Sequence, residues 1–186
     1  MTETSATAVE VAATALDVAD LELVYRVRGV DRPVLRGVSF SIERGRSYGL
    51  VGESGCGKST AALGIVRYLP RNGRISGGSI SVAGQDVLAL GARGLRDYHA
   101  RAVSMVYQNP GSALNPGLRV GVQVAEAFTV LGVPGKEAEE RAREALTRVQ
   151  IADPSSVMSR YPHQLSGGMQ QRVVIAMALA KNPALL

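Results

Sequence analysis

The stretch "GESGCGKS", residues 52 to 59, constrains the fold of this 186-residue chain more than any other feature of its sequence. It satisfies the pattern G-x-x-x-x-G-K-[ST] through Gly52, Gly57, Lys58 and Ser59. It stands between the short apolar run "SYGLVG" and the helical stretch "STAALGIVRYL". A buried strand, a glycine-rich loop and a helix in succession predict an α/β fold with a phosphate-binding loop, the P-loop.

The chemistry of this loop follows from its residue types. Glycines let the backbone turn back so that several N–H groups point inward, and the N-terminus of the next helix adds partial positive charge. Lys58 is expected to reach the β and γ phosphates of a nucleotide, and the Ser59 hydroxyl to ligate Mg²⁺. An incidental lysine in a glycine-rich turn is the alternative, and the flanking strand and helix argue against it. The expected nucleotide-binding residues of the loop are Gly52, Glu53, Ser54, Gly55, Cys56, Gly57, Lys58, Ser59 and Thr60.

Composition narrows the class of protein only a little. The net charge of +5 comes from 21 basic and 16 acidic residues without a block of like charges, which permits a nucleic-acid partner without indicating one. Cys56 is the single cysteine, so no internal disulfide can form, which is typical of a reducing compartment. In the loop it is expected to be a small filler, with a redox switch as the alternative. No apolar run approaches the roughly 20 residues that a membrane-spanning helix needs.

The remaining pattern divides the chain into a β-rich half and a helical half. Residues 1 to 15 read as a flexible tail without the features of a secretory signal. Strands are expected at residues 16–27, 34–42, 47–52, 78–84 and 102–108. Helices are expected at residues 120–131, 136–151 and 167–181, the second with one apolar stripe and one charged, solvated face.

A second motif, "LSGGMQQR" at residues 165 to 172, gives the pattern its specificity. Ser166 is a good helix N-cap. Gly167 and Gly168 have no side chains, so the backbone at the helix N-terminus is open to an anion. The stretch resembles the signature motif of ABC-type ATPases, in which the signature of one subunit completes the ATP site of its partner. Ser166 and Gly168 would then contact the γ-phosphate on another chain. Met169 departs from the commoner glutamine of the family, so a side-chain contact there is not implied.

Two further positions match the family. Gln108, in "MVYQNP", falls where the Q-loop glutamine of the family links the γ-phosphate, Mg²⁺ and the attacking water to the helical subdomain. A polar residue at a strand end is the alternative. Tyr25, in "LELVY", matches the aromatic residue that stacks on adenine, and ordinary packing of a strand tyrosine is the alternative.

The stretches "YQNPGSALNP" and "YPHQLSGG" resemble the ATPase subunits of oligopeptide, dipeptide and nickel importers, with departures at Asn109, Gly111 and Ala113. The resemblance implies a P-loop NTPase with a RecA-like core, an antiparallel β subdomain and a helical subdomain at about 109–165. It implies ATP and Mg²⁺, a second ABC ATPase subunit, identical or paralogous, and membrane permease subunits served by a solute-binding protein. It places the chain at the cytoplasmic face of the plasma membrane as a peripheral protein, without nucleic acid.

The resemblance covers residues 16 to 186 and implies a nucleotide-binding domain that stops before the Walker B carboxylates and the switch histidine. His163 precedes the signature and is expected to be a surface or helix-cap residue. Residues 1 to 186 alone are therefore expected to fold poorly and to hydrolyse ATP at background rates. Two other classes stay open: an ABC ATPase acting on DNA or ribosomes, and a non-catalytic nucleotide-binding fragment. The first usually carries long insertions or tandem copies, whereas only about 105 residues separate the two motifs here.

Overall fold

Two long strands form the basis of the sheet, because apolar residues alternate with polar ones along both. In the computed structural model, which describes residues 14–186, they are β1 (Thr14–Val27) and β2 (Val30–Glu43), paired antiparallel. The turn between them is Arg28–Gly29, both with positive φ, so it is shorter than the six-residue turn that the sequence suggests. The expected tail lies outside the described residues except for Thr14 and Ala15, which begin β1.

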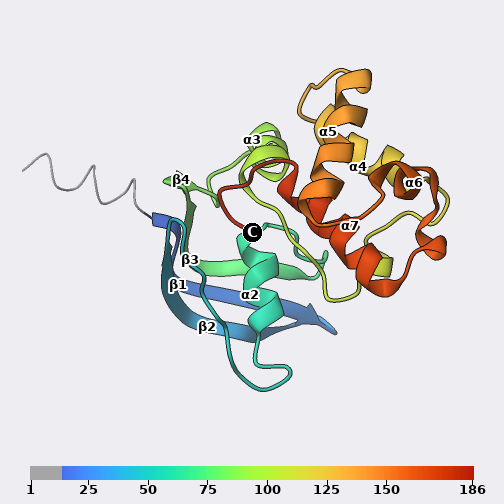
Figure 1. Cartoon of the computed structure of the whole chain (residues 1–186). Coiled ribbons are helices and arrows are strands. Elements are labelled where there is room, and N and C mark those ends of the chain that lie inside the picture. Colours follow the sequence, from blue (N-terminus) through green and yellow to red (C-terminus); the bar gives the residue numbers. More distant parts are fainter. Residues whose placement is uncertain (1–13) are drawn as a thin grey trace, which may run out of the picture. The chain divides into compact units, whose positions relative to one another are not determined.

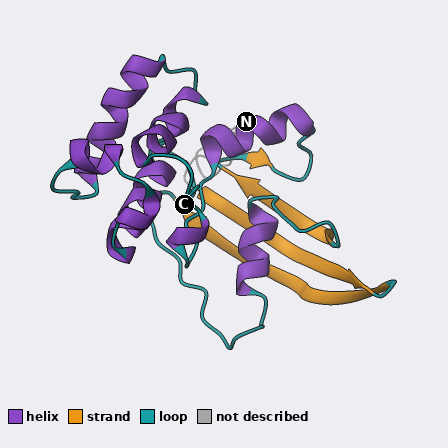
Figure 2. Cartoon of the chain, turned by 90° about the vertical axis from the view of Figure 1, so that its right-hand side faces the viewer, coloured by secondary structure: helices purple, strands orange, loops and turns teal. Residues whose placement is uncertain are grey.

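The chain divides into two compact units, one ending at residue 99 and the other beginning at residue 100 (Figure 1). The first contains a four-stranded antiparallel sheet of order β2-β1-β3-β4, with β3 at Gly73–Val82 and β4 at Gln85–Asp86. The helix α2 (Lys58–Ile65) lies against one face of this sheet (Figure 2). A methyl group on Gly64 of α2 would lie 3.4 Å from Cδ1 of Leu23, which is fully buried. Leu23 therefore marks the sheet face that α2 covers.

Tyr98 fixes the end of α2 in the same unit. It follows α3 (Ala92–Asp97), begins a π-helical turn (Tyr98–Ala102) and is 1% exposed. Its hydroxyl donates to the carbonyl of Ile65 at 2.9 Å. Ile65 is the last residue of α2, and the last carbonyls of a helix receive no hydrogen bond from within the helix. Burial raises the pKa of Tyr98 to about 12, and the nearby charge of Arg67 opposes this shift.

The second unit is helical. It contains α4 (Val120–Thr129), α5 (Gly135–Arg148), α6 (Pro154–Ser159) and α7 (Gly167–Leu179), with short 3-10 helices at Pro110–Ser112 and Pro162–Gln164. The apolar stripe of α5 is buried through Ala138, Ala142 and Leu146, as its sequence period predicts. The core that these helices share consists of Leu114, Val120, Val124, Ala125, Phe128, Ala138, Ala142, Leu146, Ile151, Val157, Leu165, Val173, Val174 and Ala176.

The three long helices predicted from the sequence are confirmed, each within a few residues of its expected ends. On the charged face of α5, Arg141 forms an ion pair with Glu137 at 2.6 Å. Near the end of the described chain, Leu185 is a single bridge residue, and the N–H of Ala184 donates to the carbonyl of Ala102 at 2.9 Å. Within residues 14–186, no helix has the length and the apolar character that crossing a membrane would require.

Two strands predicted from the sequence are wrong. Residues 47–52 contain no strand, residues 102–108 contain only a single bridge residue, Val103, and Val51 is 97% exposed rather than buried. The physical reason is that a strand exists only where a neighbouring strand pairs with its backbone. The described sheet contains β1 to β4, and none of these pairs with either segment. The strand expected at residues 78–84 is confirmed, but it begins earlier, at Gly73, and ends at Val82.

Candidate nucleotide-binding site

Lys58 holds the P-loop together from inside. Its ammonium group donates to the carbonyl oxygens of Gly52 at 2.7 Å and Glu53 at 2.6 Å, and it lies 3.3 Å from Sγ of Cys56. An ammonium group has three donors, so all three point into the loop. The positive charge is thus centred where the loop curves, and an anion that binds there would exchange one of these contacts for its own.

The backbone around Lys58 supplies further donors. Among the described residues, the N–H groups of Gly55 and Gly57 donate no backbone hydrogen bond, whereas that of Cys56 donates to Glu53 O at 3.3 Å. The first N–H groups of α2 have no acceptor within the helix. Ser59 is exposed in this first turn. Free N–H groups, an ammonium group and a hydroxyl make a donor set that fits the phosphates of a nucleotide and a hydrated divalent cation.

Gly57 brings the P-loop into close contact with strand β2 of the sheet. It is the N-cap of α2 with φ of 101°, a conformation that favours glycine. A methyl group on Gly57 would lie 2.8 Å from Cδ2 of Leu35 and 3.7 Å from Cγ1 of Val34, both in β2. The backbone therefore approaches β2 more closely than a side chain would allow. This close approach fixes the start of α2 over the edge of the sheet that β2 forms.

Tyr25 lies on the same sheet face. On β1 it follows Leu23 by two residues, so both side chains point to the face that α2 covers. It is half-buried and stands opposite Arg32 of β2 and Gly73 of β3. A methyl group on Gly73 would lie 2.6 Å from Cε1 of Tyr25, so the ring lies over the Gly73 backbone. Tyr25 and the P-loop thus belong to the same unit, and stacking of Tyr25 on adenine stays a prediction.

The signature motif belongs to the second unit. The hydroxyl of Ser166 accepts from the N–H of Met169 at 3.3 Å, which confirms the predicted N-cap of α7. Gly167 and Gly168 are exposed, and no atom lies within 4 Å of the place where a methyl group on either would be. The helix N-terminus therefore presents bare backbone to its surroundings. Its contact with a γ-phosphate stays a prediction.

Sequence reasoning missed the role of the polar residues that follow the signature. The amide of Gln170 donates to the carbonyls of Pro162 at 2.9 Å and Leu165 at 3.3 Å. The guanidinium of Arg172 donates to the carbonyl of Val149 at 2.7 Å, just beyond the end of α5. Both side chains tie the signature helix to the segments before it. The signal available in the sequence was their polarity at the start of an otherwise apolar helix.

Gln108 is exposed, at a bend before the 3-10 helix Pro110–Ser112. Asn109 caps that helix, because its side chain accepts from the N–H of Gly111 at 3.1 Å. Gln108 shares the second unit with the signature, and Lys58 belongs to the first. His163 is exposed and its ring stacks on Tyr161 at 5.8 Å between centroids, so the prediction of a surface histidine is confirmed.

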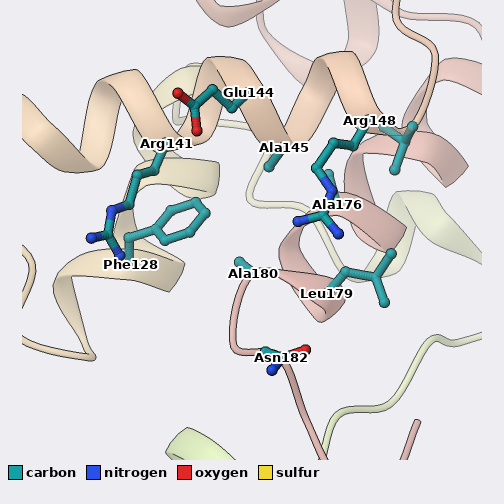
Figure 3. Close-up of a pocket in the computed structure, with 10 residues that line it drawn as sticks. Phe128, Arg141, Glu144, Ala145, Arg148, Ala176, Leu179, Ala180 and Asn182 are labelled. Atoms are coloured by element: carbon teal, nitrogen blue, oxygen red, sulfur yellow. The ribbon is translucent and has the colours of Figure 1, made fainter.

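The second unit also contains a hollow of about 310 Å³ between α4, α5 and the end of α7. Figure 3 shows Arg141, Glu144 and Arg148 of α5 around it, with Phe128 and Leu179 from the neighbouring helices. None of the residues predicted to bind nucleotide lines this hollow. It is therefore separate from the candidate site.

Comparison with known proteins agrees with this geometry. The sequence profile described as "ABC transporter" matches residues 35–186. The chain is 45% identical to a probable peptide ABC transporter ATP-binding protein of Sinorhizobium fredii, over 92% of this chain and 52% of that protein. It is 38% identical to the oligopeptide transport ATP-binding protein of Bacillus subtilis, over 92% of this chain and 48% of that protein. A probable D,D-dipeptide transport ATP-binding protein of Escherichia coli is 42% identical, over 92% of this chain and 53% of that protein.

The fold has solved counterparts. An ATP-binding cassette, solved as a dimer in a post-hydrolysis state with ADP and Pi, matches with a TM-score of 0.78 and 26% identity, over 90% of this chain and 70% of that one. The predicted fold class, a P-loop ABC ATPase with an antiparallel sheet, is therefore confirmed. The chain spans about half the length of the curated relatives it matches. With its P-loop seated on the sheet and its signature serine capping α7, the chain belongs to the ABC transporter family.

Proposed function

We propose that this chain is part of an ATP-binding subunit that couples ATP hydrolysis to the import of peptides, or of a related solute such as nickel, through a membrane permease. The observation that carries the proposal is the donor set of the P-loop, with Lys58 at its centre and the free N–H groups around it. The printed functions of the curated relatives, which are peptide and oligopeptide transport, support the choice of solute.

Each predicted site residue has a role in this proposal. Lys58 reaches the β and γ phosphates, the N–H groups of the loop bind phosphate oxygens along the chain of phosphates, and Tyr25 stacks on adenine. Ser59 and Gln108 would hold Mg²⁺, which neutralises charge on the phosphates when it is bound. Residues 16 to 186 form part of the nucleotide-binding domain, with its helical subdomain at about 109–165. Positioning and electrostatic stabilisation supply most of the acceleration in phosphoryl transfer to water.

We propose further that two such subunits assemble head to tail. Ser166, Gly167 and Gly168 of one subunit would then complete the ATP site on the P-loop of the other. The exposure of both glycines at the start of α7 supports this arrangement, as does the dimeric state of the similar ATP-binding cassette. The assembly would bind permease subunits at the cytoplasmic face of the plasma membrane and receive solute from a solute-binding protein.

The test is ATP hydrolysis by the whole protein that carries this chain, reconstituted with its permease and solute-binding protein in liposomes. We expect oligopeptides to stimulate hydrolysis several-fold, and Lys58→Ala to abolish both the basal and the stimulated rates. Lys136→Ala, on the exposed start of α5, is the matched control and should leave both rates unchanged. Stimulation by DNA or ribosomes, with none by peptide and permease, would contradict the proposal. Stimulation by nickel alone would keep the transport function and change the solute.

A further inference from the structure

Gln170, in the first turn of α7, lies between the loop that precedes the signature and the turn that follows Gln108. Its amide nitrogen donates to the carbonyls of Pro162 at 2.9 Å and Leu165 at 3.3 Å. Its amide oxygen faces Gly111, because a methyl group on that glycine would lie 3.3 Å from Oε1 of Gln170. All of these residues belong to the second unit. One side chain therefore contacts both segments that adjoin the predicted ATP contacts of this unit.

The turn that follows Gln108 is held by its own hydrogen bonds. The side chain of Asn109 accepts from the N–H of Gly111 at 3.1 Å, and the hydroxyl of Ser112 donates to the carbonyl of Asn109 at 2.8 Å. Both bonds close within the turn, so its residues move together. A displacement of Gln108 is therefore passed on to Gly111 and is not absorbed between them.

Gly111 makes the contact with Gln170 possible. It is exposed and its φ is not positive, so the backbone of the turn does not require a glycine. A side chain at this position would meet the amide oxygen of Gln170 more closely than ordinary van der Waals contact allows. The absence of a side chain at Gly111 therefore lets the turn and α7 come into direct contact.

Gln170 also fixes the serine of the signature. Its side chain donates to the carbonyl of Leu165, the residue before Ser166, and its backbone N–H donates to the carbonyl of Ser166 at 2.9 Å. Leu165 is itself buried in the core of the unit. The position of Ser166 therefore depends on where Gln170 lies.

We propose that Gln170 is a positioning residue that links the segment of Gln108 to the signature and so couples the two ATP sites of the assembly. The inference rests on the proposed head-to-tail assembly, in which Gln108 acts on the ATP of its own chain and Ser166 on the ATP of the partner. A shift of Gln108 on binding of the first ATP moves Gly111, Gln170 and Ser166 in turn. The first ATP thereby raises the affinity of the assembly for the second, and the coupling is reciprocal.

The experiment measures how ATP hydrolysis depends on ATP concentration in the whole protein that carries this chain, reconstituted with its permease. We expect a Hill coefficient of about 1.5 or more for the wild type and of about 1 for Gln170→Ala, because two uncoupled sites bind independently. The ATP affinity of the whole protein as a monomer without its permease should change less than about twofold, because Gln170 lies outside the unit that contains the P-loop.

Gly111→Ala tests the other side of the contact and keeps every hydrogen bond of Gln170. The added methyl group displaces the amide by a few tenths of an ångström, so the Hill coefficient should fall part of the way to that of Gln170→Ala. In the Gln170→Ala background the same substitution should have no further effect. Gly135→Ala, at the start of α5, is the matched control, because nothing lies within 4 Å of its methyl group, and it should keep the wild-type coefficient.

Four results would overturn the inference: a wild-type Hill coefficient of 1, a wild-type coefficient in Gln170→Ala, no effect of Gly111→Ala, and additive effects of the two substitutions. If circular dichroism shows that Gln170→Ala is unfolded, Gly111→Ala against Gly135→Ala decides the question. If Lys58→Ala abolishes hydrolysis and Gln170→Ala leaves the Hill coefficient unchanged, the proposed function stands and the role of Gln170 fails. If the wild type hydrolyses no ATP, both fail.

Discussion

At the scale of single residues, Tyr98 and Gly57 each make one contact that holds the P-loop helix in place. The hydroxyl of Tyr98 satisfies a carbonyl at the end of α2, and Gly57 allows the start of α2 to approach β2. Neither role is visible in the sequence, because each depends on a partner that is distant along the chain. The motif itself was predictable, because its spacing is local.

Tyr98→Phe removes a buried hydrogen bond and a titrating group together. At neutral pH we expect the free energy of unfolding to fall by about 1 kcal/mol, because the carbonyl of Ile65 loses its donor. The pKa of Tyr98 is raised to about 12, so the folded state disfavours the phenolate. The stabilisation is complete below the unfolded pKa, about 10, and is lost as the pH rises from about 10 to about 12. Urea unfolding across that range checks this.

The Phe variant is its own control for the pH dependence. Between about pH 10 and pH 12, the wild type should lose on the order of 2 kcal/mol of stability relative to Tyr98→Phe. Parallel curves for the two proteins would mean that Tyr98 ionises as readily in the folded state as in the unfolded state. Absorbance at the phenolate band during alkaline titration would report the same transition directly.

Gly57→Ala tests whether the close approach of Gly57 to β2 holds the P-loop in place. The new methyl group would lie 2.8 Å from Cδ2 of Leu35, and φ of 101° is strained for alanine. We expect a loss of about 2 kcal/mol in unfolding free energy together with loss of ATP binding. Gly45→Ala is the control: its φ is +73° and nothing lies within 4 Å, so it carries only the strain of about 1 kcal/mol. Equal destabilisation by both substitutions would show that strain, and not contact with β2, fixes Gly57.

At the scale of elements, the first residue before α7, Ser166, has two roles. Ser166 caps the helix, and in the proposed assembly it also faces a phosphate. Ser166→Ala should lower the stability of the second unit by about 1 kcal/mol, since the N–H of Met169 loses its acceptor. Thermal unfolding followed by circular dichroism measures this change.

Ser166→Asp separates the two roles. Aspartate is as good an N-cap as serine, so stability should stay close to that of the wild type. Its negative charge would repel a phosphate at the same helix terminus, so ATP-dependent dimerisation should be lost. Sedimentation with ATP measures the assembly. Dimerisation of Ser166→Asp at the wild-type ATP concentration would contradict the proposed contact of the signature with nucleotide.

Elements with a strong local pattern were predictable from the sequence, and elements that depend on neighbours were not. The period of 3.6 in residues 136–151 and the cap at Ser166 predicted α5 and α7. Residues 47–52 have the composition of a buried strand, yet no described strand pairs with them. The close approach of Gly57 to Val34 and Leu35 joins segments that are distant along the chain, and it has no sequence signal of its own.

At the scale of the whole molecule, the two motifs that are predicted to bind phosphate belong to different compact units. The P-loop and Tyr25 lie in the first, and Gln108 and the signature lie in the second. In the proposed assembly, the two motifs of one chain serve two nucleotides, each completed by the neighbouring subunit. Binding of ATP to the P-loop can therefore be measured apart from any effect of the signature, on the whole protein that carries this chain and without its permease.

The most direct test of the account is the ATP affinity of the whole protein that carries this chain, measured by isothermal titration calorimetry with Mg²⁺ for the wild type, Lys58→Ala and Lys136→Ala. We expect the wild type and Lys136→Ala to bind one ATP per chain with the same affinity. Lys58→Ala should bind at least about tenfold more weakly, because it removes the charge at the centre of the loop. Equal ATP binding by all three proteins would contradict the assignment of residues 52–60 as the nucleotide site.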